Sequence, residues 1–168
     1  MSHSFVALTT LVVLCPLLAI PSISAGEACS ILGTASSDRI EGTPRADVIC
    51  ARAGNDRVMS KGGSDTIRGG AGWDRLHGGL QGDTISGGPG QDVLTGSDHR
   101  DVLRGGPGAD RIRGGNWPDR LFGGSGDDLL DAVDVTSGTN VVRGGTGEDV
   151  CRVEVEDEVY GCETVTMP

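Results

Sequence analysis

An aspartate that recurs every nine residues is the feature that most constrains how this chain can fold. From Asp38 to Asp128 an aspartate stands at every ninth position, and an Ile, Val or Leu follows two residues after each one. Eleven such pairs in one unbroken frame are too regular to reflect loop composition. Internal repetition at a short fixed period indicates a solenoid, in which each repeat packs only on its neighbours.

Alternate repeats differ in their glycines, which doubles the period to 18 residues. A complete Gly-Gly-x-Gly-x-Asp turn ends at Asp74, Asp92, Asp110, Asp128 and Asp149, whereas the repeats between them keep only parts of it. We therefore expect two repeats per coil, with one turn on each of two edges. The first edge holds the turns ending at residues 38, 56, 74, 92, 110, 128 and 149. The second edge holds those ending at 47, 65, 83, 101, 119 and 140.

The aliphatic residues of the repeat predict the core. After a six-residue turn, three residues remain for a strand, whose middle side chain faces inward while the two flanking ones face outward. Thirteen inward Ile, Leu or Val residues run from Ile31 to Val142. Residues 131–139 hold an insertion of three residues, after which the frame resumes. The prediction is an all-β, right-handed parallel β-roll over about residues 31–152, with an acidic C-terminal cap at 153–168.

The composition limits the classes of partner. The chain has 168 residues, enough for one domain, with 29 glycines, 3% aromatic residues and a net charge of −10. A nucleic-acid partner is not expected, because such proteins present a basic surface. A cation is the natural partner of a chain with this charge.

The N-terminal residues 1–25 indicate a secretory signal peptide. They contain no Lys, Arg, Asp or Glu, and an apolar run from Leu11 to Ile20 precedes the small residues Ser24 and Ala25. An uncleaved anchor is the alternative, although the run is short for a membrane span. We expect a secreted mature chain, residues 26–168, without a stable membrane span.

Four cysteines remain outside that leader, in two pairs that flank the repeats: Cys29 with Cys50, and Cys151 with Cys162. An even number in an exported chain indicates disulfides, which would staple the terminal coils. For Cys29 and Cys50, free thiols are an alternative, because a regular coil would separate them by roughly 10 Å of strand. Pairing them would require the chain before Ile31 to fold back.

The turn aspartates point to a hard metal ion. Carboxylates stacked every ~4.8 Å along the roll repel one another unless a cation lies between them. Aspartate and turn carbonyl oxygens form the flexible oxygen shell that Ca²⁺ prefers. The turns ending in an intact motif contain no His or Cys, which argues against zinc or copper.

The unit Gly-Gly-x-Gly-x-Asp-x-aliphatic-x resembles the hemolysin-type (RTX) calcium-binding nonapeptide of the parallel β-roll. The resemblance implies several Ca²⁺ ions held between turns adjacent on one edge, by glycine carbonyls and aspartate carboxylates. It assigns the carboxylates to Asp56, Asp74, Asp92, Asp110, Asp128 and Asp149. It assigns the carbonyls to Gly69, Gly70, Gly72, Gly87, Gly88, Gly90, Gly105, Gly106, Gly108, Gly123, Gly124, Gly126, Gly144, Gly145 and Gly147. Because the second edge lacks an intact motif, we expect one well-formed column of ion sites.

The expected function is calcium binding that is required for folding, without catalysis. Toxins and proteases with such repeats carry a separate effector domain, for which this chain has no room, and we identify no catalytic residue. An extracellular adhesion or glycan-binding module, stabilised by calcium, is the alternative. Outward-facing Arg39, Arg57, Arg75 and Arg111 form a near-column that would suit an anionic polymer, although we favour their pairing with the acidic edge.

Overall fold

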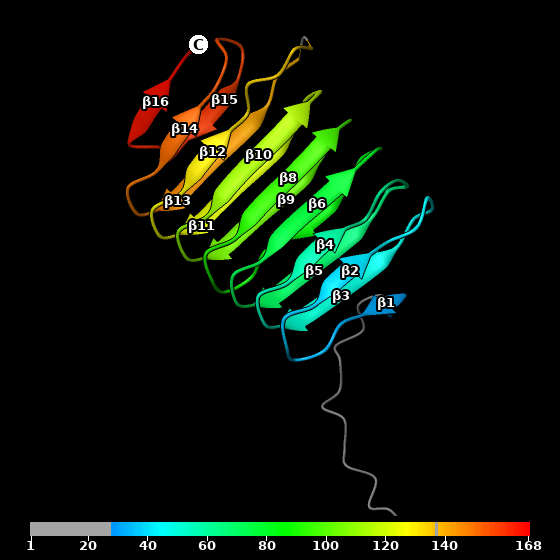
Figure 1. Cartoon of the computed structure of the whole chain (residues 1–168). Helices are drawn as coiled ribbons and strands as arrows, with labels where there is room; N and C mark the ends of the chain where they lie inside the picture. Colours follow the sequence, from blue (N-terminus) through cyan, green and yellow to red (C-terminus); the bar gives the residue numbers. More distant parts are fainter. Residues whose placement is uncertain (1–27, 137) are drawn as a thin grey trace, which may run out of the picture.

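The computed structural model describes residues 28–136 and 138–168, so the predicted signal peptide, residues 1–25, lies outside the described part. The chain forms two eight-stranded parallel sheets stacked as a solenoid of eight coils (Figure 1). Sheet A contains β1 (Ile31–Leu32), β3 (Val48–Ala53), β5 (Thr66–Ala71), β7 (Thr84–Ser86), β9 (Val102–Pro107), β11 (Arg120–Ser125), β13 (Val141–Thr146) and β15 (Glu158–Tyr160). Sheet B contains β2 (Arg39–Glu41), β4 (Arg57–Met59), β6 (Arg75–Gly79), β8 (Val93–Asp98), β10 (Arg111–Asn116), β12 (Leu129–Asp131), β14 (Val150–Arg152) and β16 (Thr164–Thr166).

The strand pairing confirms that two repeats make one coil. Each strand pairs in parallel with the strand two places along the chain, so Ile49 lies between Ile31 and Ile67 in register. At the insertion the register jumps, and Leu121 pairs with Val142. The three extra residues are therefore accommodated in the loop before β13, as the sequence predicted, and the roll continues unbroken.

The core is the predicted zipper of aliphatic side chains. Each inward Ile, Leu or Val from Ile40 to Val142 is buried, and Ile31 packs partly buried against them in the first described strand. Ala51, Ala132, Cys151 and Val153 add to the core. Successive side chains alternate between buried and exposed along the strands, because side chains in a strand point to opposite faces.

Two details differ from the sequence-based expectation. Strands such as β9 run for six residues instead of three, because the glycine pair continues the ladder and Gly106 pairs with Gly124. The C-terminal segment 153–168 is itself a coil: Val159 pairs with Val142, and Val165 pairs with Cys151. The last coil therefore covers the end of the aliphatic core without the glycine pattern.

Both predicted disulfides are closed. The Cα atoms of Cys29 and Cys50 lie 5.9 Å apart, and those of Cys151 and Cys162 lie 6.0 Å apart. The alternative of free thiols for the first pair is wrong, because the chain preceding β1 brings Cys29 next to the following coil. Across the described ranges, no helix has the length and apolar character needed to cross a membrane.

Candidate metal centre

The aspartates form two buried ladders, one along each edge of the roll. Along each ladder a backbone N–H donates to Oδ1 of the aspartate one coil later; Asp92 donates to Asp110, and Asp83 to Asp101, at 2.8 and 2.7 Å. Towards the C-terminus Asn140 and Glu163 take the acceptor's place for Asp119 and Asp149. From Asp56 onward these residues are at most 2% exposed. One carboxylate oxygen of each is thus used to hold neighbouring coils together.

The second oxygen, Oδ2, has no hydrogen-bond partner in ten of these residues. They are Asp56, Asp74, Asp92, Asp110, Asp128 and Asp149 on the first edge, and Asp65, Asp83, Asp101 and Asp119 on the second. A buried carboxylate oxygen without a partner is costly, because it loses its hydration and gains nothing in exchange. These atoms require a ligand that the described protein residues do not supply.

The first glycine of each turn keeps a space open beside that oxygen. A Cβ atom on Gly87 would overlap Oδ2 of Asp92 and would lie 2.8 Å from the carbonyl oxygen of Gly105 in the next coil. The glycine therefore leaves a small cradle between a carboxylate and a carbonyl of adjacent turns. The same overlap with an aspartate Oδ2 occurs at Gly69, Gly78, Gly96, Gly105, Gly114, Gly123 and Gly144.

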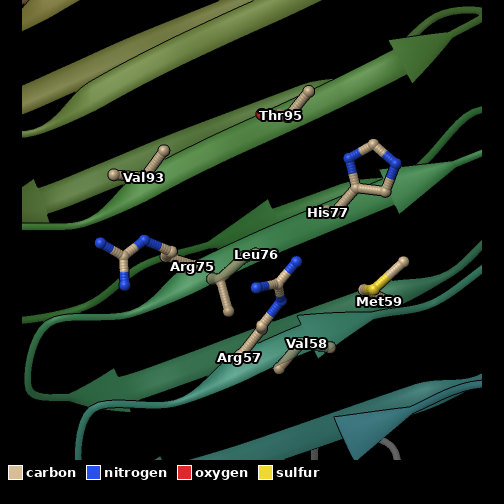
Figure 2. A pocket seen from close by; sticks show the side chains of 8 residues that line it. All are labelled: Arg57, Val58, Met59, Arg75, Leu76, His77, Val93 and Thr95. Carbon is tan, nitrogen blue, oxygen red and sulfur yellow. The ribbon is translucent and has the colours of Figure 1, made fainter. Parts of the chain in front are cut away.

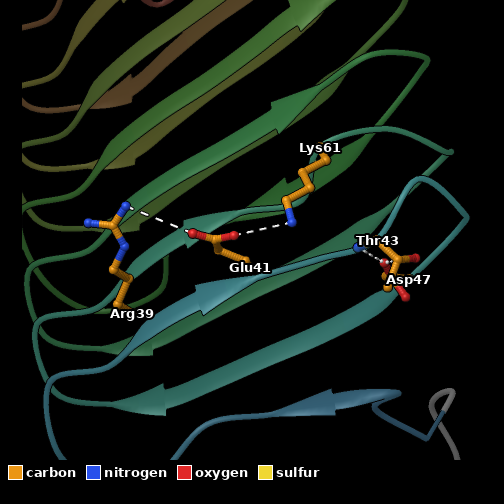
Figure 3. Close-up of polar contacts among 5 residues, drawn as sticks. All are labelled: Arg39, Glu41, Thr43, Asp47 and Lys61. Atoms are coloured by element: carbon orange, nitrogen blue, oxygen red, sulfur yellow. Dashed lines mark hydrogen bonds and ion pairs between the residues drawn. The ribbon is translucent and has the colours of Figure 1, made fainter.

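Four turns near the N-terminus close the cradle with protein atoms. Thr43 donates its N–H and its hydroxyl to Oδ2 of Asp47 (Figure 3), and Thr34 does the same for Asp38. Ala51 stands in register with Gly69, so its Cβ takes the place that glycine leaves open. Ser60, in register with Gly78, donates its hydroxyl to the Gly78 carbonyl. The open series therefore begins at Asp74.

Burial makes several carboxylates of the open series reluctant to ionise, and repulsion from neighbouring carboxylates adds to this at some of them. Burial raises the pKa of Asp92 to about 7, the N–H of Asp74 lowers it, and the neighbouring carboxylates raise it further. Burial likewise raises the pKa of Asp101 to about 8, with added repulsion from Asp119, Asp83 and Asp98. A cation within the column would relieve both causes, because it compensates the lost hydration and separates the like charges.

The glycines assigned from the sequence divide into two roles. The first glycine of each motif lines the cradle, as described. The second and third take left-handed backbone angles, as at Gly88 (φ 110°) and Gly90 (φ 146°), and lie against carbonyls of the preceding coil. The structure therefore brings the first glycine and the aspartate of each intact motif together, and the other two glycines shape the turn around them.

The second edge keeps the same geometry although its glycines are incomplete. Gln81 (φ 74°), His99 (φ 74°) and Trp117 (φ 81°) occupy the third-glycine position and still adopt the left-handed conformation. The sequence reasoning left out Asp83, Asp101 and Asp119, whose Oδ2 atoms are as unpartnered as those of the first edge. The signal for them is the first glycine, which is kept as Gly78, Gly96 and Gly114.

The donor set fits a calcium ion. Apart from the one at Gly114, each cradle offers a carboxylate oxygen and a backbone carbonyl oxygen, which are hard ligands of the type that Ca²⁺ binds. Among the described residues, no three His, Cys, Asp or Glu side chains converge on one point, so a zinc-type cluster of side chains is not present there. The further oxygen atoms beside these carboxylates come from backbone carbonyls of successive turns and not from side chains.

Comparison with known protein families matches this chain to the RTX calcium-binding nonapeptide repeat (4 copies). The matched segments are residues 32–67, 51–85, 79–112, 104–132 and 134–151, which together span more than half of the 168 residues. A search among curated proteins found no significant match. The matched segments coincide with the coils that carry the two aspartate ladders.

Proposed function

The chain belongs to the RTX calcium-binding nonapeptide repeat family, and we propose that it is a secreted protein whose roll folds around several Ca²⁺ ions. The observation that carries the proposal is the row of buried Oδ2 atoms without partners, eight of which lie beside a cradle kept open by a glycine. The eight open cradles are those of Asp74, Asp92, Asp110, Asp128 and Asp149 on the first edge and Asp83, Asp101 and Asp119 on the second. We propose that ions are held on both edges.

Calcium is proposed to decide whether the roll forms. The inward side chains form a single thin row of aliphatic residues, so the core is small for the amount of chain that must be ordered. Without metal, folding must also bury stacked carboxylates whose second oxygens have no partner. Because the cradles exist only when adjacent coils are stacked, the free energy of metal binding becomes free energy of folding.

Far-ultraviolet circular dichroism tests this directly. We expect the disulfide-intact chain in chelator at pH about 8, close to the raised pKa of Asp101, to lack most β structure. It should gain that structure cooperatively on addition of Ca²⁺. Mg²⁺ should substitute poorly, because it demands a tighter shell and gives up its water reluctantly. A full β spectrum in chelator at that pH would reject the folding role.

Secretion and a non-catalytic role complete the proposal. Calcium sites of this kind suit an extracellular setting, and the two closed disulfides suit an oxidising one. RTX repeat rolls are generally structural calcium-binding elements, which supports a binding role for this chain. Fractionation of cells that express the full chain, with and without residues 1–25, tests the export step.

A further inference from the structure

The outer face of sheet B carries a shallow groove that the calcium sites do not explain. One hollow of about 300 Å³ lies over β4, β6 and β8, and a second of about 240 Å³ lies over β8, β10 and β12. The two hollows share Val93 and Thr95 as lining residues, so they lie next to each other along the axis of the roll and are referred to together as the groove. It crosses the strands and lies between the two outward-facing side chains of each strand, such as Val93 and Thr95 of β8.

Basic side chains border this groove. Arg57 and Arg75 are paired in register on neighbouring strands and lie side by side, with His77 further along β6 (Figure 2). Arg111 and Arg113 line the second hollow, both exposed, on the same strand β10. The lining includes one carboxylate, that of Asp131, which forms an ion pair with Arg152. In a chain with a net charge of −10, four arginines and a histidine against one carboxylate are a local reversal of charge.

The favoured expectation that this arginine column pairs with the acidic edge is wrong. Among the described residues, the ion pairs are Arg39 with Glu41, Lys61 with Glu41, and Arg152 with Asp131. Of the arginine column, Arg39 alone takes part in one of these ion pairs, and its partner Glu41 is the other outward-facing residue of β2 (Figure 3). The edge aspartates are buried and accept backbone N–H groups, so their carboxylates do not face the arginines.

We propose that this groove binds a linear acidic polysaccharide that carries uronate carboxylates. Guanidinium groups bind carboxylates through paired hydrogen bonds, which gives them both affinity and orientation. Arg57 and Arg75 lie one strand spacing apart, about 4.8 Å, and Arg111 lies two spacings beyond Arg75. A polyuronate repeats its carboxylate with every sugar unit along an extended chain, so it presents charges on a similar scale.

The shape and lining of the groove favour a saccharide over a nucleic acid. The groove extends past a single site, because its two hollows are neighbours that share Val93 and Thr95, which suits a chain of repeated units. Its lining residues include Met59, Val93 and Thr95, and the imidazole of His77 is the one aromatic ring among them. Binding of single-stranded nucleic acid depends on a series of aromatic platforms for successive bases, whereas the described lining offers a single imidazole and no Phe, Tyr or Trp side chain.

The inference uses only the face of sheet B, so it does not rest on the proposed calcium sites. The test uses the folded chain in calcium-containing buffer, with its β content checked by circular dichroism. Isothermal titration calorimetry with short oligogalacturonates, too short to gel with calcium, should detect binding that weakens with salt. The neutral methyl esters of the same oligosaccharides should not bind.

Matched charge variants decide where the ligand binds. The double variant Arg57→Gln with Arg75→Gln should weaken binding roughly tenfold, because it removes two carboxylate partners. The control Arg104→Gln with Arg120→Gln removes the same charge from exposed positions of sheet A and should leave binding within about twofold. Equal losses in both variants, or no binding by the parent chain, would overturn the proposal. An oligonucleotide of equal charge that binds as tightly would overturn the choice of polysaccharide.

Discussion

Thr43 donates both its backbone N–H and its hydroxyl to Oδ2 of Asp47, at 2.7 and 2.9 Å. In the turns from Asp74 onward, the equivalent oxygen has no protein partner and lies beside an open cradle. In the N-terminal coil, protein groups thus donate hydrogen bonds to Oδ2, whereas in the later turns this oxygen is left for a ligand. This contrast makes the proposed ion sites testable by adding or removing single atoms.

Filling one cradle should remove an ion while every carboxylate stays in place. In Gly87→Ala the new Cβ would occupy the space between Oδ2 of Asp92 and the Gly105 carbonyl. We expect native mass spectrometry to count at least one ion fewer than in the parent chain. The control is Gly62→Ala, where the nearest atom to a Cβ is at 3.7 Å and no cradle is involved. Loss of an ion from both variants, or from neither, would contradict the cradle assignment.

Opening a closed cradle should add an ion. Ala51→Gly removes the Cβ that stands where Gly69 stands one coil later, next to the unpartnered Oδ2 of Asp56. The expected result is one more bound ion, even though glycine loses more conformational freedom on folding than alanine and so lowers the stability of the strand. Ala53→Gly makes the same chemical change two residues later and should add none. If Ala51→Gly leaves the ion count unchanged, the Cβ is not what limits this turn.

The two edges should contribute comparably to the ion count. Asp92→Asn on the first edge and Asp101→Asn on the second each keep an Oδ1 acceptor for the neighbouring coil and remove the charge beside a cradle. We expect each to lose at least one ion, whereas Asp131→Asn, on the outer face of sheet B, should lose none. If Asp101→Asn retains the full count while Asp92→Asn does not, only the first edge binds ions.

Acid should partly replace calcium. In the metal-free fold the pKa of Asp83 is raised to about 7 and that of Asp101 to about 8, against about 3.9 in an unfolded chain. Between those values the folded chain holds more protons than the unfolded chain, so the free energy of unfolding falls as the pH rises. This stability is fully present below pH ~3.9 and is lost as the pH rises through about 7 to 8.

Circular dichroism in chelator across that range provides the measurement. The chain should show more β structure at pH about 4 than at pH about 8, and added Ca²⁺ should abolish most of the difference. The double variant Asp92→Asn with Asp101→Asn carries two fewer titrating groups, so its signal should depend less on pH. Identical spectra of the chelated parent chain at both pH values would contradict the proposed cause.

The nine-residue frame was enough to predict the roll, because each repeat contacts only its neighbours in a solenoid. The alternation of side chains placed residues such as Leu103 inward, and the 18-residue difference between repeats predicted the pairing of every second strand. The shift of register at Asn140 could be predicted as well, because Asn140 stands nine residues before Asp149 and so takes the aspartate position of its repeat. Local periodicity therefore contained the register of the whole fold.

Only the tertiary structure decided which turns are open to an ion. The sequence motif separated the two edges by their glycines, yet the stacked coils hold Gln81 and His99 in the same left-handed conformation that glycine adopts. Whether a cradle is open depends in part on contacts between coils, such as that of the Ser60 hydroxyl with the Gly78 carbonyl one coil later. Such contacts between coils arise from stacking, because residues 18 positions apart become neighbours only when the roll has formed.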